Sequence, residues 1–135
     1  MAEFSLDPRL AVDSLPVAAL ALSDVRLTRD ANYPWLILVP RRAALTEIID
    51  LDASARATLI EEIARAGEAL RSAVACDKLN IAALGNVVAQ LHVHVIARRR
   101  NDVAWPKPVW GAAPAKAYAP GEAEALAERL AARLK

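Results

Sequence analysis

The sequence of 135 residues has little of several features that mark particular classes of protein. It contains a single cysteine, Cys76, so no disulfide can form within the chain, and we expect a reducing, cytoplasmic location. Its charges almost cancel, with 17 Lys and Arg against 16 Asp and Glu. A dedicated nucleic-acid-binding protein usually carries a strong basic excess, so we expect no nucleic-acid partner.

The sequence also has no clear targeting signal or membrane anchor. Residues 1–8 lack the basic start and apolar run of a signal peptide. Residues 79–97 carry no formal charge and are long enough to cross a bilayer. Five polar side chains interrupt this stretch: Asn80, Asn86, Gln90, His92 and His94. Placing them in lipid would be costly, so we predict two strands joined by a turn and no membrane partner.

The spacing of apolar residues predicts an α+β domain. Short apolar or alternating runs predict strands at 17–22 and 25–28, and the continuous run at 35–39 is typical of a central strand covered on both faces. After Asp52, a good N-cap, apolar residues recur at helical spacing to about residue 77. Two further strands are expected over 79–84 and 87–98. This order of elements favours a mostly antiparallel sheet.

The composition changes toward the end of the chain. Residues 105–111 are rich in Trp and Pro, and residues 112–120 form an Ala/Pro linker. A last helix is predicted from Glu122 to Leu134, because its acidic start and basic end suit the helix dipole. We therefore expect a domain over residues 1–111, with the linker and C-terminal helix of residues 112–135 packed on or beside it.

Both histidines of the chain lie in the segment Gln90-Leu91-His92-Val93-His94. In a strand, Gln90, His92 and His94 would share one face, spaced by roughly 6.5–7 Å. A neutral imidazole can attack phosphorus through one ring nitrogen when an acceptor holds the other. The row therefore predicts a catalytic or binding site. The alternatives are two satisfied polar residues at a sheet surface, or a metal site, for which the segment has neither a third histidine nor a carboxylate.

The segment Gly85-Asn86-Val87-Val88-Ala89-Gln90-Leu91-His92-Val93-His94-Val95-Ile96 resembles the signature of the histidine triad (HIT) superfamily. In that signature, histidines alternate with apolar residues after a Gly-polar pair. The resemblance extends over residues 10–111. It implies an antiparallel sheet of about five strands with one long helix, usually paired as a homodimer. It also implies hydrolysis or transfer at the α-phosphate of a nucleotide through a covalent nucleotidyl-histidine, without a cofactor or metal.

The resemblance assigns catalytic roles to three residues and substrate-binding roles to three more. His92 matches the middle histidine, which attacks, while His94 and Gln90 match the third and first positions of the triad. The binding residues are Asn86 and Asn80, which match asparagines on the phosphate side, and Asp30, which matches the acidic residue that grips the ribose hydroxyls. The implied substrates are nucleoside phosphoramidates or dinucleoside polyphosphates.

Three positions depart from the family pattern. Gln90 replaces the first histidine, Trp35 replaces a fourth histidine that often begins its strand, and Val87 replaces a serine that assists the leaving group in some members. Glutamine cannot carry a proton, but the nucleophile His92 remains. The leading hypothesis is a nucleotide hydrolase or nucleotidyl transferase with reduced or shifted activity. The alternatives are a nucleotide-binding protein with little or no turnover and, less favoured, a metal-binding protein that uses the two histidines.

Overall fold

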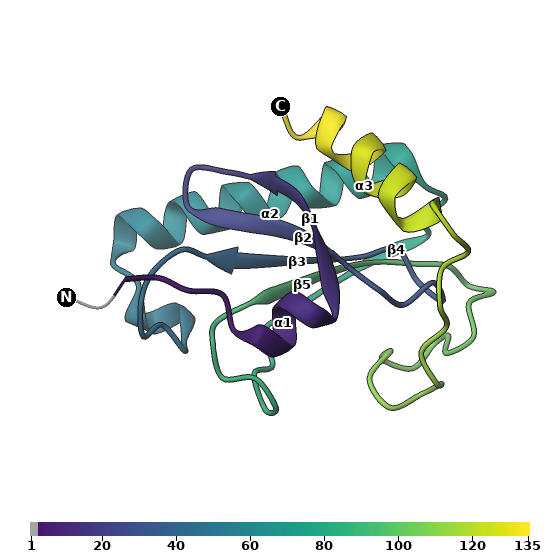
Figure 1. Ribbon diagram of the computed structural model, residues 1–135, viewed down its shortest axis with the longest axis horizontal. Helices are drawn as coiled ribbons and strands as arrows, with labels where there is room; N and C mark the ends of the chain where they lie inside the picture. The colour runs from purple at the N-terminus through teal and green to yellow at the C-terminus, as the bar shows by residue number, and fades with distance from the viewer. Residues whose placement is uncertain (1–2) are drawn as a thin grey trace.

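The computed structural model describes residues 3–135 and is built around one five-stranded antiparallel sheet (Figure 1). The strands are β1 (Ser14–Ala19), β2 (Ser23–Thr28), β3 (Trp35–Pro40), β4 (Lys78–Ala82) and β5 (Val93–Arg98). Their order across the sheet is β1-β2-β3-β5-β4, and every neighbouring pair is antiparallel. The strands β3 and β5 are therefore interior, which gives their side chains a rigid support on both sides.

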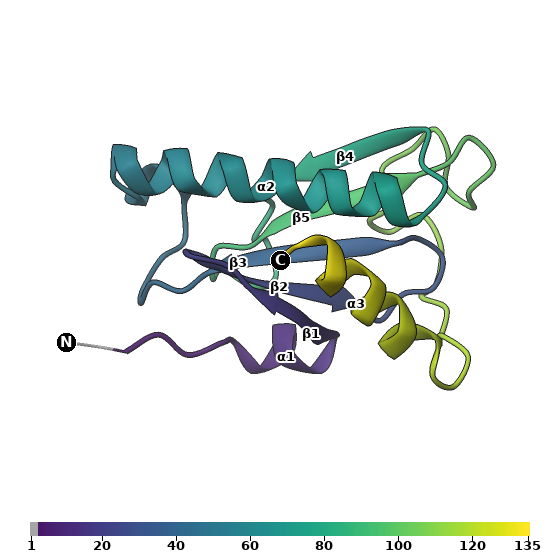
Figure 2. The same cartoon turned by 90° about the horizontal axis from the view of Figure 1, so that it is seen from above.

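Helices lie on one face and at one edge of this sheet (Figure 2). The long helix α2 (Ala53–Ala73) lies across one face, and its N-cap Asp52 accepts a hydrogen bond from the backbone N–H of Ala55. Helix α3 (Glu122–Arg133) packs against β1 and α2, and the short helix α1 (Pro8–Val12) packs against β1. A 3-10 turn, η1 (Ile48–Asp50), precedes α2.

The main hydrophobic core lies between α2, α3 and one face of the sheet. Alternate residues of β3 and β5 point into it, among them the fully buried Leu36, Leu38 and Val95. Leu130 of α3 belongs to the same core, so the C-terminal helix shares the core of the sheet. The other face of β3 and β5 points away from α2 and carries the polar residues described below.

The α+β class and the antiparallel sheet expected from the sequence are confirmed. One strand prediction is wrong, however. The expected strand over 87–98 begins only at Val93, and residues 87–92 are irregular. The backbone N–H of Leu91 donates to the carbonyl of Leu45 in a distant loop, so this part of the chain is not bonded to a neighbouring strand.

Helix α1 was not expected from the sequence, although Asp7-Pro8 carries its signal. The carboxylate of Asp7 accepts from the backbone N–H of Arg9, and Pro8 occupies the first turn, where its missing N–H costs nothing. The other expected elements are displaced by a few residues. The first strand covers 14–19 instead of 17–22, and α2 ends at Ala73 instead of near residue 77.

Candidate active site

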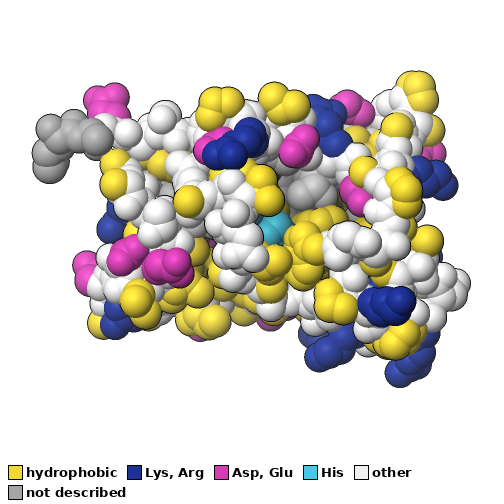
Figure 3. All heavy atoms as spheres, turned by 90° about the horizontal axis from the view of Figure 1, so that it is seen from below, with side chains coloured by type: hydrophobic (Ala, Val, Ile, Leu, Met, Phe, Trp, Pro, Cys, Tyr) yellow, Lys and Arg dark blue, Asp and Glu magenta, His cyan; other side chains and the backbone are white. Residues whose placement is uncertain are grey.

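A pocket with a volume of about 460 Å³ opens on the face of the sheet that α2 leaves free. Figure 3 shows this face, with a histidine at the bottom of a hollow among apolar side chains. Its floor includes Trp35 and Ile37 of β3 and His94 of β5. Further lining comes from α1, from the loop 84–88 and from the C-terminal linker, so segments far apart in the sequence meet there.

His92 lies in this pocket with one ring nitrogen held by its own chain segment. Its Nδ1 is 2.7 Å from the backbone carbonyl oxygen of Gln90. A carbonyl only accepts, so Nδ1 carries the hydrogen and Nε2 keeps its lone pair. No protein group in residues 3–135 hydrogen-bonds that Nε2, which leaves it free to attack an incoming group.

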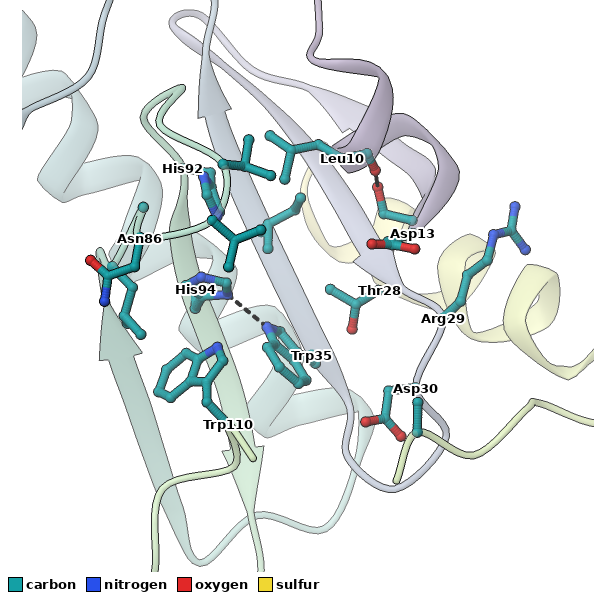
Figure 4. Close-up of a pocket in the computed structure, with 17 residues that line it drawn as sticks. Leu10, Asp13, Thr28, Arg29, Asp30, Trp35, Asn86, His92, His94 and Trp110 are labelled. Carbon is teal, nitrogen blue, oxygen red and sulfur yellow. Dashed lines mark hydrogen bonds between the residues drawn. The ribbon is translucent and has the colours of Figure 1, made fainter. Parts of the chain in front are cut away.

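His94 has the opposite arrangement of its ring hydrogen. The indole Nε1–H of Trp35 donates to Nδ1 of His94 over 2.9 Å, so the hydrogen of the neutral ring lies on Nε2 (Figure 4). Burial, helped by the neighbouring His92, lowers the pKa of His94 from 6.5 to about 4. His94 is therefore neutral at pH 7 and presents an N–H donor beside His92, whose ring centroid is 4.9 Å away.

Two tryptophans form an aromatic wall around His94. The ring of Trp110 stands edge-on to His94 at 5.0 Å and to Trp35 at 5.8 Å, measured between centroids. Trp110 comes from the segment after β5 and packs on a second buried cluster that includes Tyr33 and Ile96. This wall shields the histidine from water, which contributes to the burial that keeps it uncharged.

A buried ion pair holds the loop that carries Trp110. Arg98 at the end of β5 donates from Nε to Oδ2 of Asp102 over 2.8 Å, and both side chains are almost fully buried. The guanidinium holds the pKa of Asp102 at about 2, and backbone N–H groups of the loop also donate to its carboxylate. Breaking such a pair by removing one partner typically costs about 3–5 kcal/mol.

Asn80 does not line the pocket. Its side-chain oxygen accepts from Nη1 of Arg98 over 2.8 Å, so the amide completes the buried ion pair. The resemblance placed this residue on the phosphate side, and the structure gives it a different contact. The register explains the difference, because Asn80 lies opposite Ile96 on β5, farther along the strand from the histidines.

Gln90 also lies outside the pocket lining, contrary to the expected row of three polar side chains on one face. Its Oε1 accepts from the backbone N–H of Asp7, and its Nε2 donates to the carbonyl of Ser5, each over 2.8 Å. The alternation rule fails here because the strand begins at Val93, after this residue. The side chain of Gln90 anchors the N-terminal segment, while its backbone carbonyl holds His92.

Asp30 and Asn86, two of the expected substrate-binding residues, do line the pocket. Oδ1 of Asp30 accepts from the backbone N–H groups of Asn32 and Lys116, which ties the C-terminal linker to the pocket rim. No group in residues 3–135 bonds its Oδ2. In Figure 4 the histidines lie between Asn86 on one side and Asp30 on the other.

Several lining residues were not identified from the sequence. These are Leu10, Asp13, Ser14, Thr28, Arg29, Ile37, Leu84, Val88 and Ala115. Apart from Val88, which stands in the signature segment without an assigned role, none belongs to a motif. They meet because α1, the first three strands, the loop 84–88 and the linker fold around the same face. Trp35 was recognised as a departure from the family pattern, but its hydrogen bond to His94 was not foreseen.

Within residues 3–135, no group of three or more His, Cys, Asp or Glu side chains is placed to hold a metal ion. None of the helices in that part of the chain combines the length and apolar character needed to cross a bilayer.

Known proteins that resemble this chain belong to the histidine triad family. The family model described as HIT domain matches residues 12–101. A histidine triad protein from Bradyrhizobium japonicum is 49% identical, with a TM-score of 0.96 over 99% of this chain and 100% of that one.

The Sinorhizobium meliloti structure is titled a histidine triad (HIT) protein and is 44% identical, with a TM-score of 0.93 over 97% of each chain. The Marinobacter aquaeolei histidine triad protein is 38% identical, with a TM-score of 0.94 over 98% of this chain and 97% of that one. No curated protein matches the chain.

Proposed function

This chain belongs to the histidine triad (HIT) domain family, and we propose that it is a nucleotide hydrolase or nucleotidyl transferase that attacks through Nε2 of His92. The observation that carries the proposal is the hydrogen bond from Nδ1–H of His92 to the carbonyl of Gln90. This bond fixes the tautomer with a free Nε2, and it stabilises the positive charge that the ring acquires when Nε2 forms a bond.

The proposed reaction has two displacements at the α-phosphorus. In the first, the Nε2 lone pair of His92 forms a P–N bond while the bond from phosphorus to the leaving group breaks and its electron pair departs with that group. In the second, a water or alcohol oxygen attacks phosphorus and loses its proton, and the P–N electrons return to Nε2. The products are the nucleoside monophosphate or its ester and the free leaving group. An amine leaving group takes a proton from the solvent before or as its bond to phosphorus breaks, whereas a phosphate leaving group departs as the anion.

The two sides of the pocket suit different parts of the substrate. The free Oδ2 of Asp30 is an acceptor for ribose hydroxyls, so we place the nucleoside on that side and the leaving group beside Asn86. Of the described residues that line the pocket, Arg29 is the one cation, and it lies near Asp30 (Figure 4). On the Asn86 side, Nη1 of Arg9 donates to the backbone carbonyl of Val87 over 3.1 Å, while Oδ2 of Asp7 pairs with its guanidinium at 3.2 Å. We therefore keep both nucleoside phosphoramidates and dinucleoside polyphosphates as proposed substrates.

Intact-mass spectrometry tests this proposal directly. The protein is mixed with an adenosine phosphoramidate, a diadenosine polyphosphate and matched substrates of other bases, then quenched in acid-free denaturant. We expect turnover, and a nucleotidyl mass on the wild-type chain that maps to His92 and is absent from His92→Ala. A folded wild-type protein that shows neither turnover nor adduct across the panel would refute the enzymatic proposal.

A nucleotide-binding protein with little turnover is the second candidate, and two contacts favour it. The side chain of Gln90 is engaged with the N-terminal segment, and Trp35 occupies the place of a further histidine. This hypothesis predicts that calorimetry detects binding of a nucleoside monophosphate. It also predicts that His92→Ala weakens this binding only modestly. Turnover of any substrate in the panel would decide against it.

A homodimer is also part of the proposal. The strand β4 is at the edge of the sheet, and its Ile81 is 51% exposed, so the edge offers both unpaired backbone groups and an apolar side chain to a second copy. Sedimentation at several protein concentrations tests this, and a monomer at every concentration would contradict it.

A further inference from the structure

The two histidines of the pocket hold their ring hydrogens on opposite nitrogens because their partners differ. The carbonyl of Gln90 accepts from His92, whereas the indole of Trp35 donates to His94. The indole nitrogen of tryptophan is a donor and never an acceptor. Trp35 therefore dictates the chemical role of the histidine beside it, and the following inference extends the proposed function to that role.

We propose that Trp35 is a positioning residue that fixes His94 as a neutral Nε2–H donor, so that His94 hydrogen-bonds the reacting phosphoryl group without giving up a proton. Protonation of His94 would place an N–H on Nδ1, facing the N–H of Trp35 at 2.9 Å. The indole bond would be lost, and two donors would face each other in a buried site.

Proton donation from the neutral ring is equally unfavourable. His94 could lose its Nε2 hydrogen only by becoming an imidazolate, which a buried site with an aromatic wall does not stabilise. Both directions of proton transfer are thus closed while the Trp35 bond holds. What remains is a fixed dipole aimed into the pocket, the kind of donor that stabilises charge developing on phosphoryl oxygens without rearrangement.

Among residues 3–135, no charged group next to His94 opposes this arrangement. On β3 its neighbours are Trp35 and Ile37, on β4 it lies opposite Ala82, and Trp110 covers it from the loop. His92 is the titratable group in contact with it. The other titratable groups that line the pocket are Asp13, Arg29 and Asp30, which Figure 4 places on the opposite side.

The fixed ring hydrogen of His94 also affects which leaving groups can react. If His94 supplies a hydrogen bond but no proton, the departing group leaves with its electron pair and takes its proton from water. The rate should then fall steeply as the basicity of the leaving atom rises. Trp35 would thereby determine which leaving groups the enzyme accepts.

Nitrogen NMR of the imidazoles provides the first test, and it needs no substrate. The chain has two histidines, so the long-range proton–nitrogen spectrum of the labelled wild-type protein contains only four imidazole nitrogens. At pH 7 we expect Nδ1–H for His92 and Nε2–H for His94, with the Trp35 indole proton shifted by its bond to nitrogen. A His94 ring with its hydrogen on Nδ1, or with both nitrogens protonated, would overturn the proposal.

Trp35→Phe removes the donor and keeps an aromatic ring, and Trp110→Phe is the matched control. Both tryptophans contact the His94 ring, but only Trp35 donates to it among residues 3–135. We expect Trp35→Phe to give a mixture of His94 tautomers and Trp110→Phe to leave the tautomer unchanged. If Trp35→Phe does not fold, site-specific incorporation of 3-benzothienylalanine at position 35 removes the N–H with almost no change of shape. An unchanged His94 tautomer in the folded variant would refute the role of Trp35.

Turnover of adenosine monophosphate aryl esters with leaving groups of graded basicity supplies the second readout. We expect a steep decline in the wild type and a shallower one in Trp35→Phe, where His94 can take up and donate a proton. With the least basic leaving group, Trp35→Phe should lose about tenfold in kcat with little change in KM. Equal slopes in the two proteins would overturn the leaving-group role. Correct tautomers in a wild-type protein without turnover would instead refute the proposed function and leave the tautomer assignment standing.

Discussion

Residues 87–92, which contain His92, and residues 93–98, which contain His94, hold their histidine side chains in different ways. Residues 87–92 are irregular, and His92 is held by the carbonyl of Gln90 only two residues before it. Residues 93–98 form β5, and His94 is held by Trp35, 59 residues earlier in the chain, on the neighbouring strand. The proposed nucleophile is thus positioned by a local contact in the chain, and the proposed donor by a tertiary contact.

The hydrogen bonds that hold the two histidines should therefore respond differently to amino-acid substitution. The bond that holds the His92 ring uses a backbone carbonyl, so a substitution at Gln90 leaves that carbonyl in place. The bond that orients His94 uses a side chain, so one substitution at Trp35 can remove it. The first region should therefore depend on loop conformation, and the second on the identity of a single residue.

The largest effect is expected from replacing the two histidines separately. His92→Ala removes the nucleophile and should lower turnover by about 10⁴-fold or more, with no adduct. His94→Ala removes one hydrogen-bond donor and should cost about 10²-fold, with the adduct still formed. Steady-state rates and intact masses of both variants check this. Equal losses in the two variants would mean that the segment acts as one unit and would break the comparison.

A pH-dependent loss of stability is the next largest effect. The pKa of His94 is about 4 in the folded protein against 6.5 as reference, so the unfolded chain takes up this proton first as pH falls. His94 therefore costs no stability above about pH 6.5, destabilises the fold progressively toward pH 4, and adds nothing further below that, with a total of ~3 kcal/mol.

Urea unfolding of the wild type and His94→Asn at pH 7 and pH 4.5 measures this term, because the other titrating groups are common to both proteins. The wild type should lose more stability than the variant between the two pH values. An equal loss would show that His94 ionises normally and that its surroundings resemble those of an exposed residue.

Gln90→Ala should have a smaller effect that distinguishes its side chain from its backbone. Two hydrogen bonds to the N-terminal segment are lost, which should reduce stability by about 1–2 kcal/mol and expose residues near Ser5 to proteolysis. Because the carbonyl that holds His92 remains, turnover should fall less than tenfold. Limited proteolysis and kinetics of the same preparation test both statements, and a loss as large as that of His92→Ala would place the carboxamide in the chemistry.

The smallest effect is expected from a chelator. Because no group of three or more His, Cys, Asp or Glu side chains within residues 3–135 is placed to hold a metal ion, the melting temperature and turnover should be unchanged after EDTA treatment and buffer exchange. Loss of either, restored by zinc, would revive the metal-binding alternative for the two histidines.

The sequence predicted the fold class, the central position of β3 and both main helices, because the spacing of apolar residues is set by which face is buried. It also indicated that His92, His94, Asn86 and Asp30 belong together, and all four line the pocket. It misplaced the start of β5, since an apolar run over residues 87–89 is followed by alternation from residue 90, a pattern typical of a strand, even though the backbone N–H of Leu91 bonds to a loop.

What the sequence alone determined is which residue types are available for chemistry and that His94 lies on the opposite face of its strand from Val93 and Val95, since these follow from residue type and from alternation along β5. Only the tertiary structure decided what Gln90, Asn80 and Trp35 do, because each bonds to a segment many residues away. Those partners fix the direction in which a side chain points and the nitrogen that carries a hydrogen. Neither property is encoded in the spacing of residues within a motif.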